Sequence, residues 1–590
     1  MSTPTLDVHY CIVGAGPAGL ALAAFMGKLG LKGLVITKAA HTADTPRAHS
    51  FNPFGFECFR DIGIEDAASE LATFGDALQS MRWCRSMSGT EYGRVQGWRE
   101  HPPTKIRLGS VLTTLSPCTF AEFSQSEMEP LLLKTASQNG FDVRFSTELI
   151  DVKVASAEEQ DVTVHHCTVR DLLLGHTYTI RATYLFGADG GRSHIARTLG
   201  FPFTSKPGGG KACNVLIRAD LTHLMVPARH AGLHWILKPD RTSFPGMVAH
   251  LRMVRPWNEW VLVGFRANGE DPFENLTPQS PQLLEAVREL IGDESVKIEI
   301  LRVNPWTARE SVADRYDAPG SNVFILGDAA HRHPPAFGLG SNTCVQDAYN
   351  LAWKVAYVDR GLAGAGLLDT YSSERQLVGS TLVRAANQGL RTYTKIWECL
   401  GMFSASREEG LSDLNELAAS SDNGKAKRDE LRATLDDIGY EIQSLGICYN
   451  QWYDNSGAVY LQDEEGPRPN PPKDPIAVSQ VTTYPGSRLP HAWLDVPTRG
   501  RRVSTHDIVG KGAFALLVGE GGGPWLDAAA MVASATGIPL NAHGIGFGLE
   551  YADVDREWAS RREVGEEGCV LVRPDRFVAW RAQGREKDSN

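Results

Sequence analysis

The stretch Val13-Gly14-Ala15-Gly16-Pro17-Ala18-Gly19-Leu20 stands near the start of the 590-residue chain. It follows a short apolar run, residues 9–13, that predicts a buried strand, and it opens a run of small residues that predicts a helix. In this context Gly14 allows a tight turn, Gly16 lets backbone N–H groups approach a pyrophosphate, and Gly19 lets the helix pack on the sheet. The free N–H groups of a helix N-terminus favour an anion there. The pattern predicts a dinucleotide cradle formed by Gly14, Ala15, Gly16, Pro17, Ala18 and Gly19.

The second signal of such a unit is missing. An acidic residue that binds a ribose hydroxyl is expected about twenty residues past the glycines, at the end of the second strand. Here that strand, residues 33–36, is followed by Thr37 and Lys38. The Thr37 hydroxyl is suited to hydrogen-bond a ribose and Lys38 to face a phosphate, so both are predicted to bind the cofactor. This unit alone leaves FAD, NAD and NADP open.

The composition limits the classes of partner. The length allows roughly two or three domains, and the net charge of −11 argues against nucleic acid, because phosphate binding needs clustered Lys and Arg. No apolar run reaches the length of a membrane span, and the first residues lack the basic and apolar parts of a signal peptide. The ten cysteines show no metal-ligand spacing, which predicts inert thiols in a reducing compartment and no metal site. We therefore expect a soluble cytoplasmic protein.

A second strong stretch begins at Gly327-Asp328 and ends at Gly338-Leu339-Gly340-Ser341-Asn342. A predicted buried strand precedes it, a proline-rich turn with Pro335 lies inside it, and a helix follows. Asp328 is suited to accept hydrogen bonds from ribityl hydroxyls. The backbone N–H groups of residues 338–342 are suited to meet the pyrimidine edge of a flavin, where negative charge accumulates on reduction. A glycine-rich helix start without a ligand is the poorer alternative, because strand, Asp, turn and Gly-x-Gly occur together.

With these motifs the chain resembles the class A flavoprotein monooxygenases, the group of para-hydroxybenzoate hydroxylase and phenol hydroxylase. Three motifs occur in the family's order: residues 14–19, an Asp-Gly motif around Asp189, and the Gly327-Asp328 motif. The resemblance implies that the first binds the ADP part of FAD, the second contacts FAD and NAD(P)H, and the third binds the ribityl chain and the pyrophosphate. It also implies FAD contacts from Arg47 and Gln125. The family usually has Glu where this chain has Thr37. This difference puts the contact with the adenosine ribose in question, but it does not change the assignment of FAD as the cofactor.

Further stretches resemble the phenol and chlorophenol hydroxylase branch, namely residues 45–49, 254–260, 368–375, 484–491 and 572–580. The branch implies an α/β fold: a Rossmann-like FAD-binding domain with an interleaved antiparallel-sheet substrate domain, a helical region, and a thioredoxin-like C-terminal domain that helps to form a homodimer. The expected boundaries are 1–199 and 311–400 for the FAD-binding parts, 200–310 for the substrate sheet, 401–477 for the helical region with a proline-rich linker, and 478–590 for the C-terminal domain. A redox role of the last domain is not expected, since it holds a single cysteine, Cys569.

The implied reaction is aromatic hydroxylation. NADPH or NADH reduces FAD, O2 gives a flavin C4a-hydroperoxide, and one oxygen passes to a phenolic ring. A phenolate reacts faster than a phenol, so a base near the hydroxyl is expected. Related phenol hydroxylases place an aspartate where this chain has His49, whose pKa is expected near the working pH. His49 is therefore the expected base, and a core or turn histidine is the alternative.

Two more side chains are predicted at the substrate. Arg255 is suited to hold a substrate anion, and Trp260, with Trp257, is suited to line an aromatic pocket. Surface exposure of Arg255 and ordinary sheet packing of the tryptophans are the alternatives. His331 and His333 lie in the flavin-binding loop and are expected to be structural.

The sequence leaves three functions open. The first is hydroxylation of a phenol, with the same chemistry on a larger biosynthetic aromatic or polyketide, by dearomatisation or epoxidation, as its variant. The second is a non-catalytic binding protein of the same fold, which the missing ribose carboxylate supports. The third is a flavin dehydrogenase or halogenase, although the Trp-x-Trp-x-Ile-Pro segment of related halogenases does not occur in the sequence.

Overall fold

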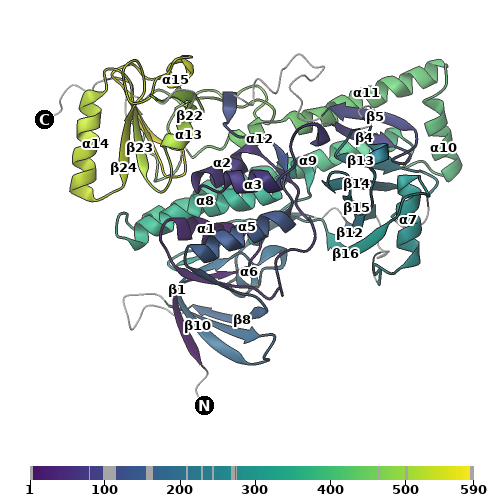
Figure 1. The fold of residues 1–590 in the computed structure, drawn as a ribbon, viewed down its shortest axis with the longest axis horizontal. Helices are drawn as coiled ribbons and strands as arrows, with labels where there is room; N and C mark the ends of the chain where they lie inside the picture. The colour runs from purple at the N-terminus through teal and green to yellow at the C-terminus, as the bar shows by residue number, and fades with distance from the viewer. Residues whose placement is uncertain are drawn as a thin grey trace.

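A computed structural model of the chain describes residues 4–78, 80–96, 114–154, 164–206, 210–226, 230–241, 245–266, 273, 275–453, 455–462, 465–497 and 502–584. The C-terminal part of the chain lies at one end of the molecule, and a large sheet lies at the opposite end (Figure 1). The long helices α8 (Gly340–Asp359) and α9 (Gly366–Cys399) run between them. Residues 463–464 of the expected linker and residues 585–590 of the expected C-terminal domain lie outside the described residues.

The first sheet carries all three sequence motifs at one edge. Its order is β18-β19-β10-β1-β2-β7, and β9 and β8 continue it beside β10. In the parallel register Val13 pairs with Gly187, and Gly187 pairs with Ile325. The turns after these residues therefore meet at the carboxyl edge of the strands, where α/β folds bind ligands. The strands are β1 (Thr5–Val13), β2 (Gly33–Ile36), β7 (Phe141–Arg144), β8 (Thr147–Val154), β9 (His165–Asp171), β10 (Thr177–Gly187), β18 (Asp317–Ala318) and β19 (Val323–Ile325).

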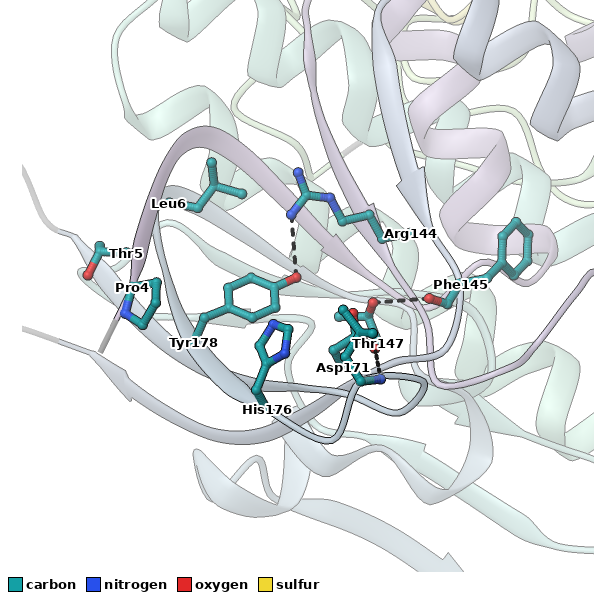
Figure 2. A pocket seen from close by; sticks show the side chains of 10 residues that line it. Pro4, Thr5, Leu6, Arg144, Phe145, Thr147, Asp171, His176 and Tyr178 are labelled. Carbon is teal, nitrogen blue, oxygen red and sulfur yellow. Dashed lines mark hydrogen bonds between the residues drawn. The ribbon is translucent and has the colours of Figure 1, made fainter. Parts of the chain in front are cut away.

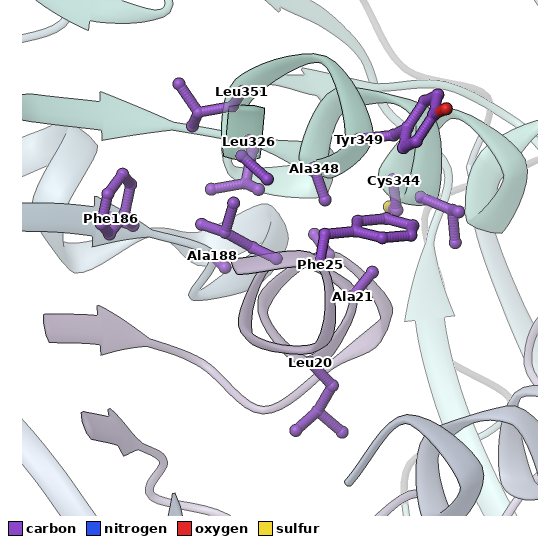
Figure 3. Close-up of a cluster of buried hydrophobic side chains, with 14 of the residues drawn as sticks. Leu20, Ala21, Phe25, Phe186, Ala188, Leu326, Cys344, Ala348, Tyr349 and Leu351 are labelled. Carbon is purple, nitrogen blue, oxygen red and sulfur yellow. The ribbon is translucent and has the colours of Figure 1, made fainter. Parts of the chain in front are cut away.

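Helix α1 (Pro17–Lys28) is buried along most of its length. It lies between the parallel sheet and α8, which explains its small and apolar residues, and Pro17 starts it where no backbone N–H is needed. Figure 3 shows Phe25 of α1 beside Tyr349 of α8, with ring centroids 5.3 Å apart. Helix α5 (Gln125–Gln138) packs on another side of α1. This packing fixes the start of α1 at the edge of the sheet.

A seven-stranded sheet forms the second layer, in the order β16-β12-β15-β14-β13-β4-β5. On β15, Trp260 and Leu262 face α7 (Pro281–Ile291), whereas Val261 and Val263 face the other way, as the alternation of a strand requires. The sheet is not confined to residues 200–310, because β4 and β5 come from the segment that the sequence assigned to the FAD-binding part, and β4 pairs with β13 in parallel. The strands are β4 (Ser80–Cys84), β5 (Glu91–Gln96), β12 (Lys211–Arg218), β13 (Leu233–Leu237), β14 (Val248–Arg255), β15 (Glu259–Arg266) and β16 (Glu299–Thr307).

Short elements connect the two layers. Two small sheets pair β3 (Ser50–Phe51) with β6 (Ala121–Glu122), and β17 (Glu310–Ala313) with β11 (Phe203–Lys206) and β20 (His331–Arg332). The connecting helices are α2 (Pro53–Asp61), α3 (Glu65–Leu71), α6 (His194–Thr198), η1 (Gly75–Leu78), η2 (Gly190–Arg192), η3 (Thr222–Leu224), η5 (Gly327–Ala329) and η6 (Ala336–Gly338). After α9 come α10 (Arg407–Glu416), α11 (Asp422–Gln443) and α12 (Gly446–Tyr449), and α11 packs against β5 and α9. The helical region thus covers one side of the seven-stranded sheet.

The C-terminal part is a separate mixed sheet in the order β24-β23-β25-β26. The strands β23 and β24 are parallel and flank α14, and β25 and β26 are antiparallel, which is the thioredoxin-like arrangement that the resemblance implied. Arg573 of this part donates to Glu374 of α9 at 2.6 Å, and both side chains are fully buried. The elements are β21 (Trp493–Asp495), β22 (Arg502–Ser504), α13 (Thr505–Ile508), β23 (Phe514–Val518), α14 (Gly523–Thr536), β24 (Leu540–Gly544), α15 (Glu557–Arg561), β25 (Cys569–Val572) and β26 (Val578–Ala582).

Candidate active site

A cavity of about 1800 Å³ opens between the carboxyl edge of the parallel sheet and the seven-stranded sheet. Most of the predicted cofactor residues line it. They are Gly14, Ala15, Gly16, Pro17, Ala18, Thr37, Lys38, Arg47, Gln125, Asp189, Asp328, Pro335, Gly338, Gly340 and Ser341. Gly19, Leu339 and Asn342 lie behind this wall and pack it. Of the predicted catalytic residues, His49 lines the cavity and Arg255 and Trp260 do not.

The glycine turn after β1 leaves no room for side chains at two of its positions. Gly14 has a φ of +113°, and a Cβ there would lie 2.1 Å from the carbonyl oxygen of Ala188. A Cβ on Gly19 would lie 1.9 Å from the carbonyl oxygen of Gly14. Gly16, in contrast, has open space around it and forms the N-cap of α1 without a side-chain hydrogen bond. The N–H groups at the start of α1 therefore face the cavity, where they are suited to bind a phosphate.

Two aspartates reach this edge from neighbouring strands. Asp189 follows β10, and its Oδ2 accepts the backbone N–H groups of His194 at 2.6 Å and Ile195 at 3.2 Å. Its Oδ1 is buried and has no hydrogen-bond partner among the described residues. Asp328 follows β19, and its side chain is exposed in the cavity. Both carboxylates are placed to accept hydrogen bonds from a bound polyol or to order a diphosphate.

The Gly-Asp loop, residues 327–342, is fastened by Asn342. The amide nitrogen of Asn342 donates to the carbonyls of Ser50 at 3.0 Å and Gly338 at 2.8 Å, and its oxygen accepts the N–H of Asn52. The Asn342 side chain therefore holds the loop, while the predicted cofactor contact of residues 338–342 is through their backbone N–H groups. Ser341, one residue earlier, lines the cavity with a buried Oγ that has no partner among the described residues.

One carboxylate near the cradle was missed by the sequence reading. Glu129 on α5 is buried and accepts hydrogen bonds from Gln125 at 2.6 Å and from the N–H of Ala43 at 2.5 Å. A Cβ on Gly16 would lie 4.0 Å from its Oε1. Burial raises the pKa of Glu129, against the lowering effect of these hydrogen bonds and of Arg47. The spacing of Gln125 and Glu129, four residues apart on a predicted helix, was the signal that both share one face.

His49 lines the cavity and is buried next to Ser50. A backbone hydrogen bond to Pro46 engages its ring, and its Nδ1 has no partner among the described residues. Burial, followed by the charge of Arg252 and the neighbouring His250, holds the pKa of His49 well below its ordinary value. The expectation of a pKa near the working pH is therefore wrong, because a protonated imidazole here lacks solvent and faces a cation.

Arg255 is outside the cavity. Its side chain is largely exposed and pairs with Glu127 at 3.2 Å on the surface. The arginine that lines the cavity is Arg252, three residues earlier on β14, which pairs with the buried Glu122 and keeps a buried Nε without a partner among the described residues. Alternation along β14 places Val248, His250 and Arg252 on the cavity face, so Arg255, three residues after Arg252, falls on the other face.

Trp260 is also outside the cavity, because it points to the α7 side of β15 and its Nε1 donates to the carbonyl of Trp257. The aromatic wall comes instead from Trp235, whose ring centroid lies 4.7 Å from that of His250 and 5.9 Å from that of Trp397. The other aromatic residues of the lining are Phe265, Trp306, Phe337, Tyr393 and Phe403. A one-residue shift along a strand exchanges the two faces, so the prediction identified the right strand and the wrong face.

Other features of the described part of the chain lie outside this cavity. A pocket of about 490 Å³ lies at the far end of β1, where Arg144 donates to the Tyr178 hydroxyl at 3.4 Å (Figure 2). No group of metal-ligating side chains occurs among the described residues. Within the same residues, no helix combines the length and the apolarity that crossing a membrane requires. His331 is buried in the Gly-Asp loop and pairs with Asp347 at 2.8 Å, as a structural role predicts.

Comparisons with known proteins agree with this arrangement. Residues 7–386 match the FAD binding domain family, and residues 482–590 match the aromatic-ring hydroxylase C-terminal family. The chain is 37% identical to 2,4-dichlorophenol 6-monooxygenase of Delftia acidovorans, over 99% of this chain and 96% of that protein. It is 38% identical to phenol 2-monooxygenase of Pseudomonas sp. (strain EST1001), over 99% and 91%. This chain belongs to the class A flavoprotein monooxygenases. A crystal structure of the flavin-dependent monooxygenase PieE in complex with FAD and substrate superposes with a TM-score of 0.89 at 35% identity, covering 98% of this chain and 97% of that one.

The residues of the cavity fit the FAD of a class A flavoprotein monooxygenase. The glycine turn leaves the start of α1 open, Asp189 Oδ1 and Ser341 Oγ are buried without partners among the described residues, and Asp328 is exposed in the cavity. These groups and the uncapped N-terminus of α8 offer the donors and acceptors that a diphosphate, a ribityl chain and a pyrimidine edge need. The chain is thus an FAD-dependent aromatic monooxygenase with NAD(P)H as co-substrate, and the predicted family, fold and cofactor are confirmed.

Proposed function

We propose that the protein hydroxylates a phenolic ring at the position ortho to its hydroxyl group. FAD, when bound at the Gly-Asp loop and the glycine turn, supplies the activation of O2 for transfer of one oxygen atom to the ring. The observation that carries the proposal is the cluster of His49, His250 and Arg252 at the inner end of an aromatic wall. The wall is suited to hold a planar ring, and the cluster to hold its hydroxyl group.

His49 and Arg252 have different proposed roles at that hydroxyl group. Burial, Arg252 and His250 hold the pKa of His49 well below its ordinary value, and its unpaired Nδ1 is suited to accept a hydrogen bond from the phenol. The positive charge of Arg252 favours the phenolate over the phenol. Because Glu122 already pairs with one end of the guanidinium, the Nε of Arg252 is the group left to meet the substrate oxygen. The hydrogen bond to His49 and the charge of Arg252 polarise the O–H bond of the phenol, which raises the electron density of the ring toward an electrophilic oxygen.

We propose roles for the residues on the cofactor side of the cavity. Gly14 to Ala18 and the Gly-Asp loop are proposed to bind the diphosphate and the flavin ring, with Asp189 and Asp328 at the ribityl chain and the pyrophosphate. Arg47, Gln125 and Glu129 are proposed at the adenosine end, where Glu129 supplies a carboxylate in place of the one missing at Thr37. Lys38 is exposed at the same end and is proposed to face a phosphate.

The experiment that tests the function is reduction and turnover with a panel of phenols. Bound flavin is mixed with NADPH without oxygen, with and without each phenol, and the reduction rate is followed by absorbance. With oxygen, consumed NADPH and O2 are compared with hydroxylated product. One phenol is expected to accelerate reduction strongly and to give equal amounts of consumed NADPH and product. Fast reduction without any aromatic, or oxygen uptake without product, would favour a dehydrogenase.

Three finer properties are proposed together. NADPH is the proposed hydride donor and a homodimer the proposed assembly, and both rest on the family resemblance. A cytoplasmic location is supported by the ten cysteines, all of which are buried thiols as expected of a reducing compartment. Initial rates with NADPH and NADH, and the mass of the holoenzyme by light scattering, test the first two. A larger biosynthetic aromatic remains the second candidate substrate, and the size of the cavity supports it.

A further inference from the structure

The outer half of the aromatic wall holds buried donors that nothing in the described chain satisfies. Trp235 Nε1, Trp397 Nε1 and Arg241 Nη2 have no hydrogen-bond partner among the described residues, and their side chains are at least nine-tenths buried. All three residues line the cavity. A buried donor without an acceptor destabilises a protein, so three of them along one cavity point to a ligand that brings acceptors.

Arg241 lies away from the proposed hydroxylation end, whereas Trp235 lies beside His250 and stands between the two ends. Val248, His250 and Arg252 alternate onto the cavity face of β14, and Val248 pairs with Leu237 at the end of β13. From Arg252 to Val248 the strand rises by about 13 Å. Arg241 follows the end of β13 and therefore lies beyond the Val248 end of this path.

A continuous series of contacts connects Arg241 with the aromatic wall of the cavity. The Arg241 guanidinium donates to the carbonyl of Gly246 at 3.1 Å, and a Cβ on Gly246 would lie 3.4 Å from the carbonyl oxygen of Phe265. The ring of Phe265 lies 6.5 Å from that of Trp397 and 6.0 Å from that of Trp235. When the phenolic ring of the substrate lies at His49, the part of the aromatic wall formed by Phe265 and Trp397 is free to contact a substituent on that ring.

The charge at the outer end is positive. Lys238 and Arg241 share one carboxylate, that of Glu289, and the next acid, Asp240, pairs with Arg85 at 3.6 Å. The acidic residues of the lining all lie elsewhere, beside Arg252 or on the strands and loops of the cofactor side. They are Glu122, Glu148, Asp189, Glu310 and Asp328. One guanidinium therefore remains without a full counter-charge at the buried outer end.

We propose that the substrate is a phenol with a carboxylate on a side chain, and that Arg241 binds this carboxylate while Trp235 and Trp397 bind the side chain and its oxygens. The inference rests on the proposed function and adds the substrate class. A simple or halogenated phenol leaves the outer donors unpaired, whereas a ring with an acidic arm satisfies both ends of the cavity. The arm must span several bonds, because the two ends are separated by most of the length of β14.

The test compares substrates that differ only in the arm. The holoenzyme is assayed with para-hydroxyphenyl alkanoic acids from the acetate to the pentanoate, with their methyl esters, and with the para-alkylphenols of matched length. Product formation, KM and the rate of flavin reduction are measured for each. The longer acids are expected to have a KM about tenfold or more below that of the matched alkylphenol, with the esters in between, as a hydrogen bond to a charged group implies.

Variants locate the effect. Arg241→Gln removes the charge, and Trp397→Phe removes only the Nε1 donor while keeping a ring. Both are expected to raise the KM for the acids about tenfold and to leave the KM for the alkylphenols and the flavin content unchanged. Arg218→Gln, which removes an exposed pair with Glu299 outside the cavity, is the control and should change neither KM.

The outcomes separate the two proposals. If acids and alkylphenols are hydroxylated with equal KM, or if Arg241→Gln and Trp397→Phe leave the acid preference intact, the acidic arm is refuted and phenol hydroxylation stands. If none of the phenols accelerates flavin reduction or yields product, phenol hydroxylation itself fails and the acidic arm fails with it. If the Arg241→Gln variant loses its flavin, the KM values of the Trp397→Phe variant alone decide whether the substrate has an acidic arm.

Discussion

The carboxylate of Asp347 on α8 accepts the backbone N–H of Gly327 at 3.1 Å, the residue at which the Gly-Asp loop begins. The same carboxylate accepts a hydrogen bond from His331 at 2.8 Å and from Arg375 at 2.7 Å. Burial would raise the pKa of Asp347, but Arg375 and His331 hold it below its ordinary value. One buried anion thus joins the cofactor loop to two helices.

Asp347→Asn is therefore expected to lower the free energy of unfolding by about 3–5 kcal/mol, because Arg375 is left buried without its counter-charge. The FAD content after dialysis should fall as well. Urea unfolding and the absorbance of bound flavin measure the two effects. Asp429→Asn, which removes an exposed pair with Lys425, is the control and should change stability by less than about 1 kcal/mol. Equal stability of both variants would show that Asp347 does not hold the loop.

Gly14 and Gly16 offer a matched pair of substitutions. Gly14→Ala is expected to disrupt folding, because its φ of +113° and a contact of 2.1 Å with Ala188 forbid a side chain. At Gly16 the φ is −85° and the nearest atom would lie 4.0 Å away, so Gly16→Ala is expected to fold normally. Its added methyl group faces the cavity and should weaken FAD binding about tenfold or more. Thermal unfolding and flavin titration separate the two effects; full FAD affinity in Gly16→Ala would place the diphosphate elsewhere.

His49→Ala is expected to keep bound FAD and to lose about a hundredfold in hydroxylation rate, because the phenol loses its acceptor. The wild-type rate should show no inflection near pH 6.5 from this residue, since burial and Arg252 keep the pKa of His49 well below that value. Product formation is measured from pH 5.5 to 8.5 at about half-unit steps. His41→Ala, on an exposed loop, serves as the control. Product formation that is unchanged in His49→Ala would remove His49 from the mechanism.

Buried neutral histidines predict acid lability. Burial lowers the pKa of His234, His250 and His491 to about 3 and that of His165 to about 4. The unfolded chain takes up protons on these groups below about pH 6.5, whereas the folded chain does not, so stability should fall as the pH drops from about 6.5 towards 4. Each such histidine contributes up to about 1.4 kcal/mol per pH unit.

His165→Leu isolates one of these contributions. Neither ring nitrogen of His165 has a hydrogen-bond partner among the described residues, so the change removes a titrating group and no hydrogen bond. The slope of the unfolding free energy against pH is measured by urea titration between about pH 4.5 and 6.5. It should decrease by the contribution of one histidine, which is at most about one proton bound on unfolding. His176→Gln, at an exposed turn, should leave the slope unchanged. An unaltered slope in His165→Leu would mean that His165 is protonated in the folded protein.

The sequence by itself determined the family, the cofactor and the end of the cavity that binds it. Backbone contacts at Gly14 and Gly19 leave no room for a side chain, so only glycine is tolerated there. A local sequence motif is therefore sufficient to identify the turn. The three motifs follow three strands of one parallel sheet, and a parallel register brings strand ends together regardless of the chain between them.

Only the tertiary structure decided the substrate end. There, the cavity face of a strand depends on which side a helix covers, which is why Arg252 and Trp235 line the cavity instead of Arg255 and Trp260. The pKa of His49 and the unpaired Nη2 of Arg241 likewise depend on residues far away in the chain. Local backbone geometry depends on neighbouring residues in the sequence. The burial of a side chain, the charges around it and the shape of a pocket depend on contacts between segments that are distant in the sequence.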